Sequence, residues 1–337
     1  MTLRLTVNGS DDEHALEQAA DIIRAGGLVA FPTETVYGLG ADATNERAVR
    51  RIFEAKERPT WDPLICHASD LAMLRQYAAE WPQSAEALAA AFMPGPITLL
   101  LAKAPEIASL CTAGRPKVGL RIPSHPIARR LIELSGVPIA APSANRFGYT
   151  SPTTAEHVLH DLEGRLDAIL DAGPTPVGVE STVIDPSAPP TIYRPGGLSR
   201  EQIEAVLGPV RIAQKPMSEN HEPAALESPG LGIRHYAPRA RVLLVEDEDT
   251  FAFALQRERE AKLGAMLPAG WKLPRGVLAM TFEWGSMNDS ETLARRLYQG
   301  LRSLDAQGAE VIIAPLPSPT GLGLAIRDRL QKAAWKK

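Results

Sequence analysis

Two cations stand at the end of one amphipathic segment. Residues 45–56 have the periodicity of a helix, with Asn45 as its N-cap, and Lys56 falls in register with the apolar face. Its ammonium group should therefore point inward. Pro59 stops the helix and leaves Arg58 just beyond its last turn, so two cations converge where a polar ligand can meet the edge of the core. An alternative stays open, because cations also favour a helix C-terminus and a lysine stem can snorkel.

Hydroxyl groups and bare backbone follow two apolar runs. LVAFPTETVYGLG places Glu34, hydroxyl residues that include Thr35, and two glycines directly after a predicted strand. IAAPSAN ends in the same way, with Ser143 and Asn145 after Ala141 and a proline. Glycines allow a ligand to approach the backbone, and hydroxyls can donate to its phosphate or carboxylate oxygens. In open α/β sheets, ligands bind at the carboxyl ends of the strands. Tight turns with capping hydroxyls are the alternative.

Further candidates lie on or beside apolar runs. In VGLRIP, Gly119 and Arg121 share one face, and a planar guanidinium can bind a carboxylate at two points. A solvated arginine on an edge strand is the alternative. VESTVID contributes Ser181 and IYRPGG contributes Arg194, although ordinary strands and turns explain both. His67, which follows LIC, is also explained as a satisfied histidine of the core.

Composition limits the class of protein. The chain has 337 residues, 45% of them apolar and 23% charged, which is typical of globular domains and suggests two of them. A net charge of −4 argues against a broad basic surface for nucleic acid. The two cysteines match no zinc motif and give no disulfide framework, which favours the cytoplasm. The sequence shows neither an export signal nor an apolar run long enough to cross a membrane.

The order of elements predicts an α/β protein. Strands are expected at 28–31, 64–66, 97–102, 118–122, 137–141 and 182–184, and helices at 12–25, 45–56, 84–92, 127–135 and 154–162. Residues 208–239 lose this periodicity and resemble a linker or covering loop. A β-α-β-α-β-α unit should follow, with strands at 241–246, 276–282 and 311–315 and helices at 249–263, 290–307 and 322–335. The predicted domains are therefore 1–207 and 240–337.

The usual nucleotide, metal and hydrolase signatures are missing, among them GxxxxGK[ST], HExxH and GxSxG. Instead PTETVYGL, KxRP, PGPIT, RIPSHP, PSAN, STVID and RPG occur in the order and at the spacing that resemble the YrdC-like family of threonylcarbamoyl-AMP synthases. The similarity covers about residues 10–207. SPGLGIRHYAP and the C-terminal unit resemble the longer form of that family, so the resemblance implies a twisted mixed-sheet YrdC-like catalytic domain, a linker and a small Rossmann-like α/β domain.

The resemblance also implies an activity. L-threonine, bicarbonate and ATP would give threonylcarbamoyladenylate and pyrophosphate for the threonylcarbamoyladenosine modification of tRNA. Mg²⁺ would arrive with ATP, and a separate transferase would modify the tRNA, so no direct tRNA binding would be required. By matching position, threonine would be held by Thr35, His67, Arg121, Ser181 and the backbone at Ala141. ATP would be held by Arg58, Ser143, Ser151, Arg194 and Arg234, with Lys56 and Asn145 completing the set around the phosphates.

Two expected ATP contacts depart from the family pattern. Asp62 stands where the family more often has Asn, and Lys117 where a hydroxyl residue is usual. An aspartate near phosphates is repulsive unless a cation offsets it, so we hypothesise that Lys117 or the metal compensates Asp62. Arg234 lies in the linker, which we expect to fold over the nucleotide as a lid.

Two rival functions are weighed. A carbamoyl transferase that uses carbamoyl phosphate would reuse such a domain, but it should carry additional acylphosphatase-like or zinc-finger modules, and none is visible in the sequence. A non-catalytic RNA-binding module would use the same basic cleft for backbone phosphates, and it predicts salt-sensitive RNA binding without turnover.

Overall fold

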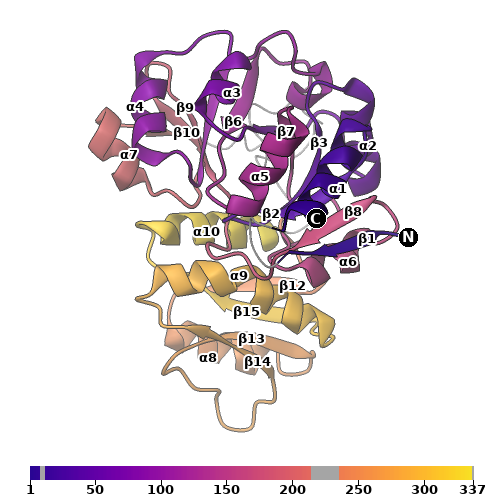
Figure 1. Ribbon diagram of the computed structural model, residues 1–337. Helices are drawn as coiled ribbons and strands as arrows, with labels where there is room; N and C mark the ends of the chain where they lie inside the picture. The colour runs from indigo at the N-terminus through magenta and orange to yellow at the C-terminus, as the bar shows by residue number, and fades with distance from the viewer. Residues whose placement is uncertain (8–11, 214–234, 336–337) are drawn as a thin grey trace. The chain divides into compact units, whose positions relative to one another are not determined.

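The computed structural model describes residues 1–7, 12–213 and 235–335 of the chain (Figure 1). Two compact units emerge. Among the described residues, the first contains 1–7, 12–147, 152–176 and 180–213, and the second contains 148–151, 177–179 and 235–335. Most of each unit follows the sequence order, but the two short segments 148–151 and 177–179 belong to the second unit.

One mixed sheet organises the first unit. Its strand order is β1-β8-β2-β3-β7-β4-β6-β5-β9-β10-β11. The strands are β1 (Leu3–Thr6), β2 (Val29–Pro32), β3 (Tyr37–Asp42), β4 (Ile65–His67), β5 (Ile97–Ala102), β6 (Lys117–Arg121), β7 (Ile139–Ala140), β8 (Ala168–Asp171), β9 (Thr182–Asp185), β10 (Thr191–Arg194) and β11 (Arg211–Ile212). The helices are α1 (Glu13–Arg24), α2 (Glu46–Lys56), α3 (Leu71–Gln76), α4 (Gln83–Phe92), α5 (Pro126–Ser135), α6 (Ala155–Leu162) and α7 (Arg200–Leu207), with a 3₁₀ turn at Ser109–Thr112.

Local signals explain the helix that ends in the two cations. The Asn45 side chain accepts hydrogen bonds from the Arg47 and Ala48 N–H groups and caps α2 as predicted. At the other end Glu57 takes a left-handed conformation with φ of 54°, and the Arg58 N–H donates to the Phe53 carbonyl at 2.9 Å. The prediction that Lys56 points inward is confirmed, because only 1% of it is exposed.

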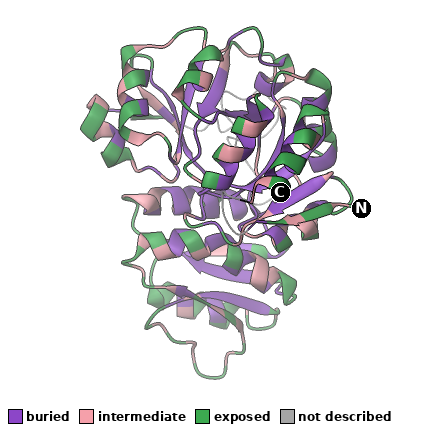
Figure 2. Cartoon of the chain, viewed as in Figure 1, coloured by how far each residue is buried: buried purple, intermediate pink, exposed green. Residues whose placement is uncertain are grey.

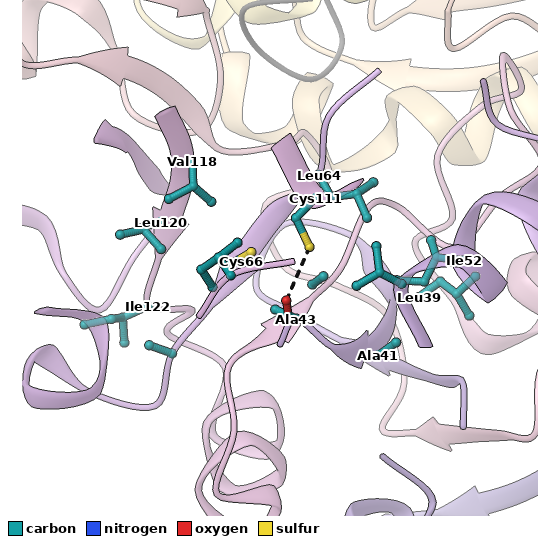
Figure 3. Close-up of a cluster of buried hydrophobic side chains, with 14 of the residues drawn as sticks. Leu39, Ala41, Ala43, Ile52, Leu64, Cys66, Cys111, Val118, Leu120 and Ile122 are labelled. Carbon is teal, nitrogen blue, oxygen red and sulfur yellow. Dashed lines mark hydrogen bonds between the residues drawn. The ribbon is translucent and has the colours of Figure 1, made fainter. Parts of the chain in front are cut away.

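The main core covers one face of the sheet. Figure 2 shows that the strands of the first unit are largely buried. Figure 3 shows part of this cluster, in which Leu39, Cys66 and Leu120 from three strands meet Cys111, whose thiol donates to the Ala43 carbonyl. The hydrogen bond with Cys66, assisted by burial, raises the pKa of the Cys111 thiol. Both cysteines are thus buried free thiols of the core.

The second unit is a four-stranded parallel sheet with the order β12-β15-β13-β14. Its strands are β12 (Arg241–Val245), β13 (Leu263–Pro268), β14 (Met280–Gly285) and β15 (Val311–Pro315), and its helices are α8 (Glu248–Arg257), α9 (Ser290–Ala306) and α10 (Leu322–Ala333). The α8 side chains pack with Ala265 and Ile313, whereas Met266 on the opposite face lies against α9. Helices therefore cover both faces, as parallel sheets require.

Several predicted elements were wrong or missed. The expected helix at 249–263 ends at Arg257, and residues 263–268 form strand β13, so the unit has one strand more than predicted. The strand expected at 276–282 lies at Met280–Gly285. In the first unit the strands β1, β3, β8 and β10 and the helices α3 and α7 were not predicted. Residues 211–212, placed in the linker, pair with β10 as strand β11.

Candidate functional site

One face of the central strands carries small and polar residues. Because strand side chains alternate, residues next to those of the main core point to the other side of the sheet. There His67 on β4 lies in register with Arg121 on β6, and Ile65 lies in register with Gly119. A Cβ atom on Gly119 would come within 3.0 Å of the Thr98 methyl group on β5, so only hydrogen fits without displacement. This face holds most of the residues that could meet a ligand.

Arg121 is held by a buried carboxylate. Its Nη2 donates to Glu34 Oε1 at 2.6 Å and to Thr35 Oγ1 at 3.1 Å, and the two charged side chains are only 4% and 7% exposed. Glu34 Oε2 in turn accepts from the Ser124 N–H at 3.1 Å. The loop between β2 and β3 is therefore tied to the end of β6 through one ion pair. The alternative of a solvated arginine on an edge strand is wrong.

A further donor of Arg121 is available for a ligand. Its Nε atom is buried and has no hydrogen-bond partner among the described residues. A buried, unsatisfied donor on a cation is costly, by roughly 1–3 kcal/mol or more, unless a ligand or water meets it. This atom gives the site an anion-binding point beside the Thr35 hydroxyl.

His67 is neutral and oriented. Its Nδ1 lies 3.3 Å from the Ile139 carbonyl oxygen, which can only accept, so Nδ1 carries the hydrogen and Nε2 remains an acceptor. Burial lowers the pKa of His67 to about 3, and the neighbouring Arg121 adds to the shift. The ring therefore supplies a neutral polar group at physiological pH.

Lys56 binds the segment that contains Ser143 and Asn145. Its Nζ donates to the Ser143 carbonyl at 2.6 Å and to the Asn145 carbonyl, while the Phe147 N–H returns a bond to the Lys56 carbonyl at 2.9 Å. The Ser143 hydroxyl donates to Asn145 Oδ1 at 2.5 Å. Burial, assisted by Arg58, holds the pKa of Lys56 well below its ordinary value. The structure thus brings three of the four residues predicted as catalytic into one cluster.

Arg58, the fourth, is paired with Asp62. Its Nη2 lies 3.0 Å from Asp62 Oδ2, and its guanidinium also donates to the carbonyls of Asp62 and Pro63. The Phe147 ring centre lies 5.9 Å from its Cζ atom. Both charged side chains are almost fully buried, so Asp62 fixes the guanidinium in a single orientation.

Lys117 has a different partner. Its Nζ donates to Asp185 on β9 and approaches Ser187 Oγ at 3.4 Å, and 37% of its side chain is exposed. The hypothesis that Lys117 offsets Asp62 is therefore wrong, because Arg58 does so over a spacing of four residues. Sequence alone had no means to choose between two cations near one carboxylate.

Ser181 and Arg194 form a third cluster. The Arg194 Nη2 donates to the Ser181 hydroxyl at 3.1 Å, and Nε and Nη2 both donate to its carbonyl. The Ser181 hydroxyl also lies 2.8 Å from that of Thr98. Since the Thr98 methyl group on β5 lies beside Gly119 on β6, this cluster continues along the same side of the sheet as Arg121.

The remaining predicted residues have separate positions. Ala141 follows β7 and its N–H donates to the Ile65 carbonyl at 2.9 Å. Ser151 is fully buried and belongs to the second unit. Arg234, and with it most of the expected lid, lies outside the described residues.

Two residues of the site were not assigned from the sequence. Glu34 was noted among the polar residues of PTETVYGLG, but nothing in the pattern showed that its carboxylate meets Arg121. Thr98 is the single hydroxyl in the otherwise apolar run ITLLLA, and its position one residue out of phase with the core leucines was an unused signal.

Over residues 1–7, 12–213 and 235–335, no helix is both long and apolar enough to span a bilayer. In the same part of the chain, no three histidine, cysteine, aspartate or glutamate side chains gather into a group that could hold a metal ion.

Comparison with known proteins defines the class. Residues 21–196 match the Sua5/YciO/YrdC family, described as "Telomere recombination", and residues 198–335 match the family described as "Threonylcarbamoyl-AMP synthase, C-terminal domain". The chain is thus a two-part protein with a YrdC-type mixed-sheet unit and a Sua5-type C-terminal unit.

Whole-chain relatives narrow the class to one family. The threonylcarbamoyl-AMP synthase of Pyrococcus abyssi is 44% identical over 99% of this chain and 98% of its own length, and that of Bacillus subtilis is 43% identical over 96% and 94%. The crystal structure of P. abyssi Sua5 complexed with L-threonine, 42% identical, covers 99% of this chain and 97% of its own with a TM-score of 0.91. The chain belongs to the threonylcarbamoyl-AMP synthase family.

Proposed function

We propose that the residues described above carry out the synthesis of threonylcarbamoyl-AMP and pyrophosphate from L-threonine, bicarbonate and ATP. The buried Nε of Arg121 is the observation that carries the proposal, because it offers an unsatisfied cationic donor among the residues expected around threonine. The substrate carboxylate would take this donor. The Thr35 hydroxyl and the neutral His67 Nε2 would meet the hydroxyl and amino groups of the same substrate.

The phosphates would bind at the second cluster. Two of the three Lys56 donors go to backbone carbonyls, and the third would be aimed at the triphosphate. The Ser143 hydroxyl would turn from Asn145 Oδ1 to donate to a phosphate oxygen when ATP binds. Arg58, fixed by Asp62, and Arg194, fixed on Ser181, would place two further guanidinium groups around the nucleotide. All these cations are positioned before ATP arrives, which favours stabilisation of charge as it develops.

The proposed reaction has two steps. The threonine ammonium group first releases one proton to solvent, bicarbonate yields carbon dioxide and hydroxide, the resulting amine attacks the carbon dioxide, and the second proton lost by its nitrogen converts the hydroxide to water. A carbamate oxygen then attacks the α-phosphorus in line, and the bond to the β-phosphate breaks with its electron pair leaving on pyrophosphate. The protein contributes position and charge neutralisation.

Mg²⁺ is proposed to come with the triphosphate. The described residues offer no carboxylate and histidine cluster of their own, and Mg²⁺ commonly binds through substrate phosphates. It would neutralise phosphate charge. The product would pass to a separate tRNA-modifying transferase in the cytoplasm, without a tRNA-binding surface on this chain.

Pyrophosphate release tests the proposal. The purified protein should release pyrophosphate from ATP only when threonine and bicarbonate are both present, and Lys56→Ala and Arg58→Ala should abolish release while the protein stays folded. Release that ignores threonine would overturn the substrate assignment. Retained activity in both variants would return Lys56 and Arg58 to purely structural roles.

A further inference from the structure

The main chain around Ser181 is fixed within the first unit. Ser181 directly precedes β9, whose first residue, Thr182, donates its N–H to the Pro96 carbonyl at 2.9 Å. Gly196 packs against the same stretch, because a Cβ atom on this glycine would come within 2.3 Å of the Ser181 carbonyl carbon. Backbone atoms cannot give way at such a distance, so the contact requires glycine. What remains to be set is the direction of the Ser181 hydroxyl hydrogen.

Two side chains meet the Ser181 hydroxyl oxygen. Arg194 Nη2 donates to it at 3.1 Å, and the Thr98 hydroxyl lies 2.8 Å from it. A guanidinium can only donate, whereas either hydroxyl of the second pair could be the donor. Thr98 and Ser181 are both fully buried, so each of their hydrogens needs an acceptor within the protein or on a ligand.

The surroundings of Thr98 indicate which hydroxyl is the donor. Among the described residues, Ser181 Oγ is the one hydrogen-bond partner of the Thr98 hydroxyl. If Ser181 donated, the Thr98 hydrogen would be buried without an acceptor in the middle of β5. If Thr98 donates, the unused hydrogen belongs to Ser181, which is one of the residues expected around threonine. The second arrangement therefore satisfies every group once a substrate oxygen is present.

The Ser181 hydroxyl lies on the same side of the sheet as the proposed threonine contacts. The Thr98 methyl group lies beside Gly119, and Gly119 and Arg121 share one face of β6 because they are two residues apart. The proposed function gives Arg121 Nε to one carboxylate oxygen of threonine. A carboxylate has a second oxygen that also accepts hydrogen bonds, and the Ser181 hydrogen is a suitable donor for it.

We propose that Thr98 is a positioning residue for threonine: by donating to Ser181 Oγ, it turns the Ser181 hydrogen toward the substrate carboxylate. The inference rests on the proposed function, since it needs threonine on this face of the sheet. Thr98 itself does not touch the substrate. A hydroxyl that accepts from a guanidinium and from a second hydroxyl is polarised, which strengthens the hydrogen bond that it donates.

The variant Thr98→Val tests the assignment, because valine keeps the shape of threonine and lacks only the donor. The Kd of threonine, measured by calorimetry, should rise by about fivefold, the equivalent of about 1 kcal/mol for one neutral hydrogen bond. Thr98→Ser, which keeps the hydroxyl, should recover most of this loss. Thr112→Val is the matched control, since Thr112 is also buried and donates to the Ser109 carbonyl of its own 3₁₀ turn. Its threonine binding should equal that of wild type.

A double-mutant cycle separates positioning from a general structural effect. Ser181→Ala removes the acceptor, so adding Thr98→Val to it should weaken threonine binding no further. An equal loss in both backgrounds would overturn the proposal. Arg194 also donates to the Ser181 carbonyl, so binding of a non-hydrolysable ATP analogue should be unchanged in Thr98→Val. Equal weakening of threonine and of the analogue would likewise contradict a role through the Ser181 hydroxyl.

Threonine binding needs no turnover, which keeps this test apart from that of the proposed function. A wild-type protein that binds threonine but releases no pyrophosphate would refute the proposed function, while the Thr98 variants would still decide the positioning role. Unchanged threonine binding in Thr98→Val would overturn the positioning role alone.

Discussion

Glu34→Gln should weaken threonine binding while leaving ATP binding unchanged. The glutamine keeps the length of the side chain and one oxygen for Arg121 Nη2, but it removes the charge from a 2.6 Å contact between two buried groups. A charge-assisted hydrogen bond contributes roughly 1.5–3 kcal/mol and a neutral one about 1 kcal/mol, so the guanidinium loses on the order of 1–1.5 kcal/mol of restraint. The expected result is a rise of about tenfold in the Kd of threonine.

An opposing electrostatic effect must be compared with this loss. Removing the negative charge of Glu34 also removes its repulsion of the substrate carboxylate, which at about 4 Å and an effective dielectric constant near 20 is roughly 4 kcal/mol. Threonine is a zwitterion, however, and its ammonium group loses an attraction of similar size. The two Coulomb contributions largely cancel. The lost orientation of Arg121 therefore decides that threonine binds more weakly to the variant.

Calorimetric titration can separate the two effects. Threonine should bind more weakly to Glu34→Gln, whereas 3-hydroxybutyrate, which lacks the ammonium group, should bind more tightly than it does to wild type. Glu13→Gln is the matched control, since Glu13 pairs with Arg130 through side chains that are 44% and 31% exposed, and exposed pairs contribute little. Equal or tighter threonine binding in Glu34→Gln would refute the reasoning.

Two further predictions concern protonation. Binding of a non-hydrolysable ATP analogue should weaken as the pH rises above neutral, because only protonated Lys56 attracts the triphosphate and burial holds its pKa well below its ordinary value; Lys56→Met should bind the analogue weakly and lack this pH dependence. The free energy of unfolding should fall by about 3 kcal/mol between pH 6.5 and pH 4 through His67 alone, because its folded pKa is about 3 and the unfolded chain binds the proton first. The contribution of His67 to stability is fully present above pH 6.5. His67→Asn should therefore reduce the fall in the free energy of unfolding between pH 6.5 and pH 4. An unchanged slope in this pH range would contradict a neutral buried ring.

The sequence predicted the elements whose pattern is local. The strand at 97–102 and the capped helix ending at Lys56 appear with the expected bounds, because apolar periodicity and caps act within a few residues. Strand β13 was missed because the predicted helix was extended from α8 through the polar residues 258–262 to Leu263, where the strand begins. Strand β3 was read as a loop because its glycines carry little strand signal, although they suit the close approach of Phe31 and Ala141.

The pairing of charges depended on tertiary structure and was not predictable from one sequence. Arg58 and Asp62 are four residues apart, which is the spacing of one helical turn. Asp62 was nevertheless predicted to pair with Lys117, because both correspond to family positions expected near ATP. In the structure Lys117 instead forms an ion pair with Asp185 on β9, 68 positions further along the chain. Likewise, the register of His67 with Arg121 follows from parallel pairing of β4 and β6, which neither strand encodes alone.

The cations of the site share one design that explains how a chain of net charge −4 can hold two anionic substrates. Each is anchored by groups of its own unit: Lys56 by two carbonyls, Arg58 by Asp62, Arg121 by Glu34 and Arg194 by Ser181. A buried cation with an internal partner is stable without substrate and does not need to be ordered when substrate binds. A cation without such a partner would have to recruit a counterion, which a substrate would then displace at a cost. Binding energy can therefore go into holding the carbamate against the α-phosphorus, provided that the remaining donors, such as Arg121 Nε, face the substrate.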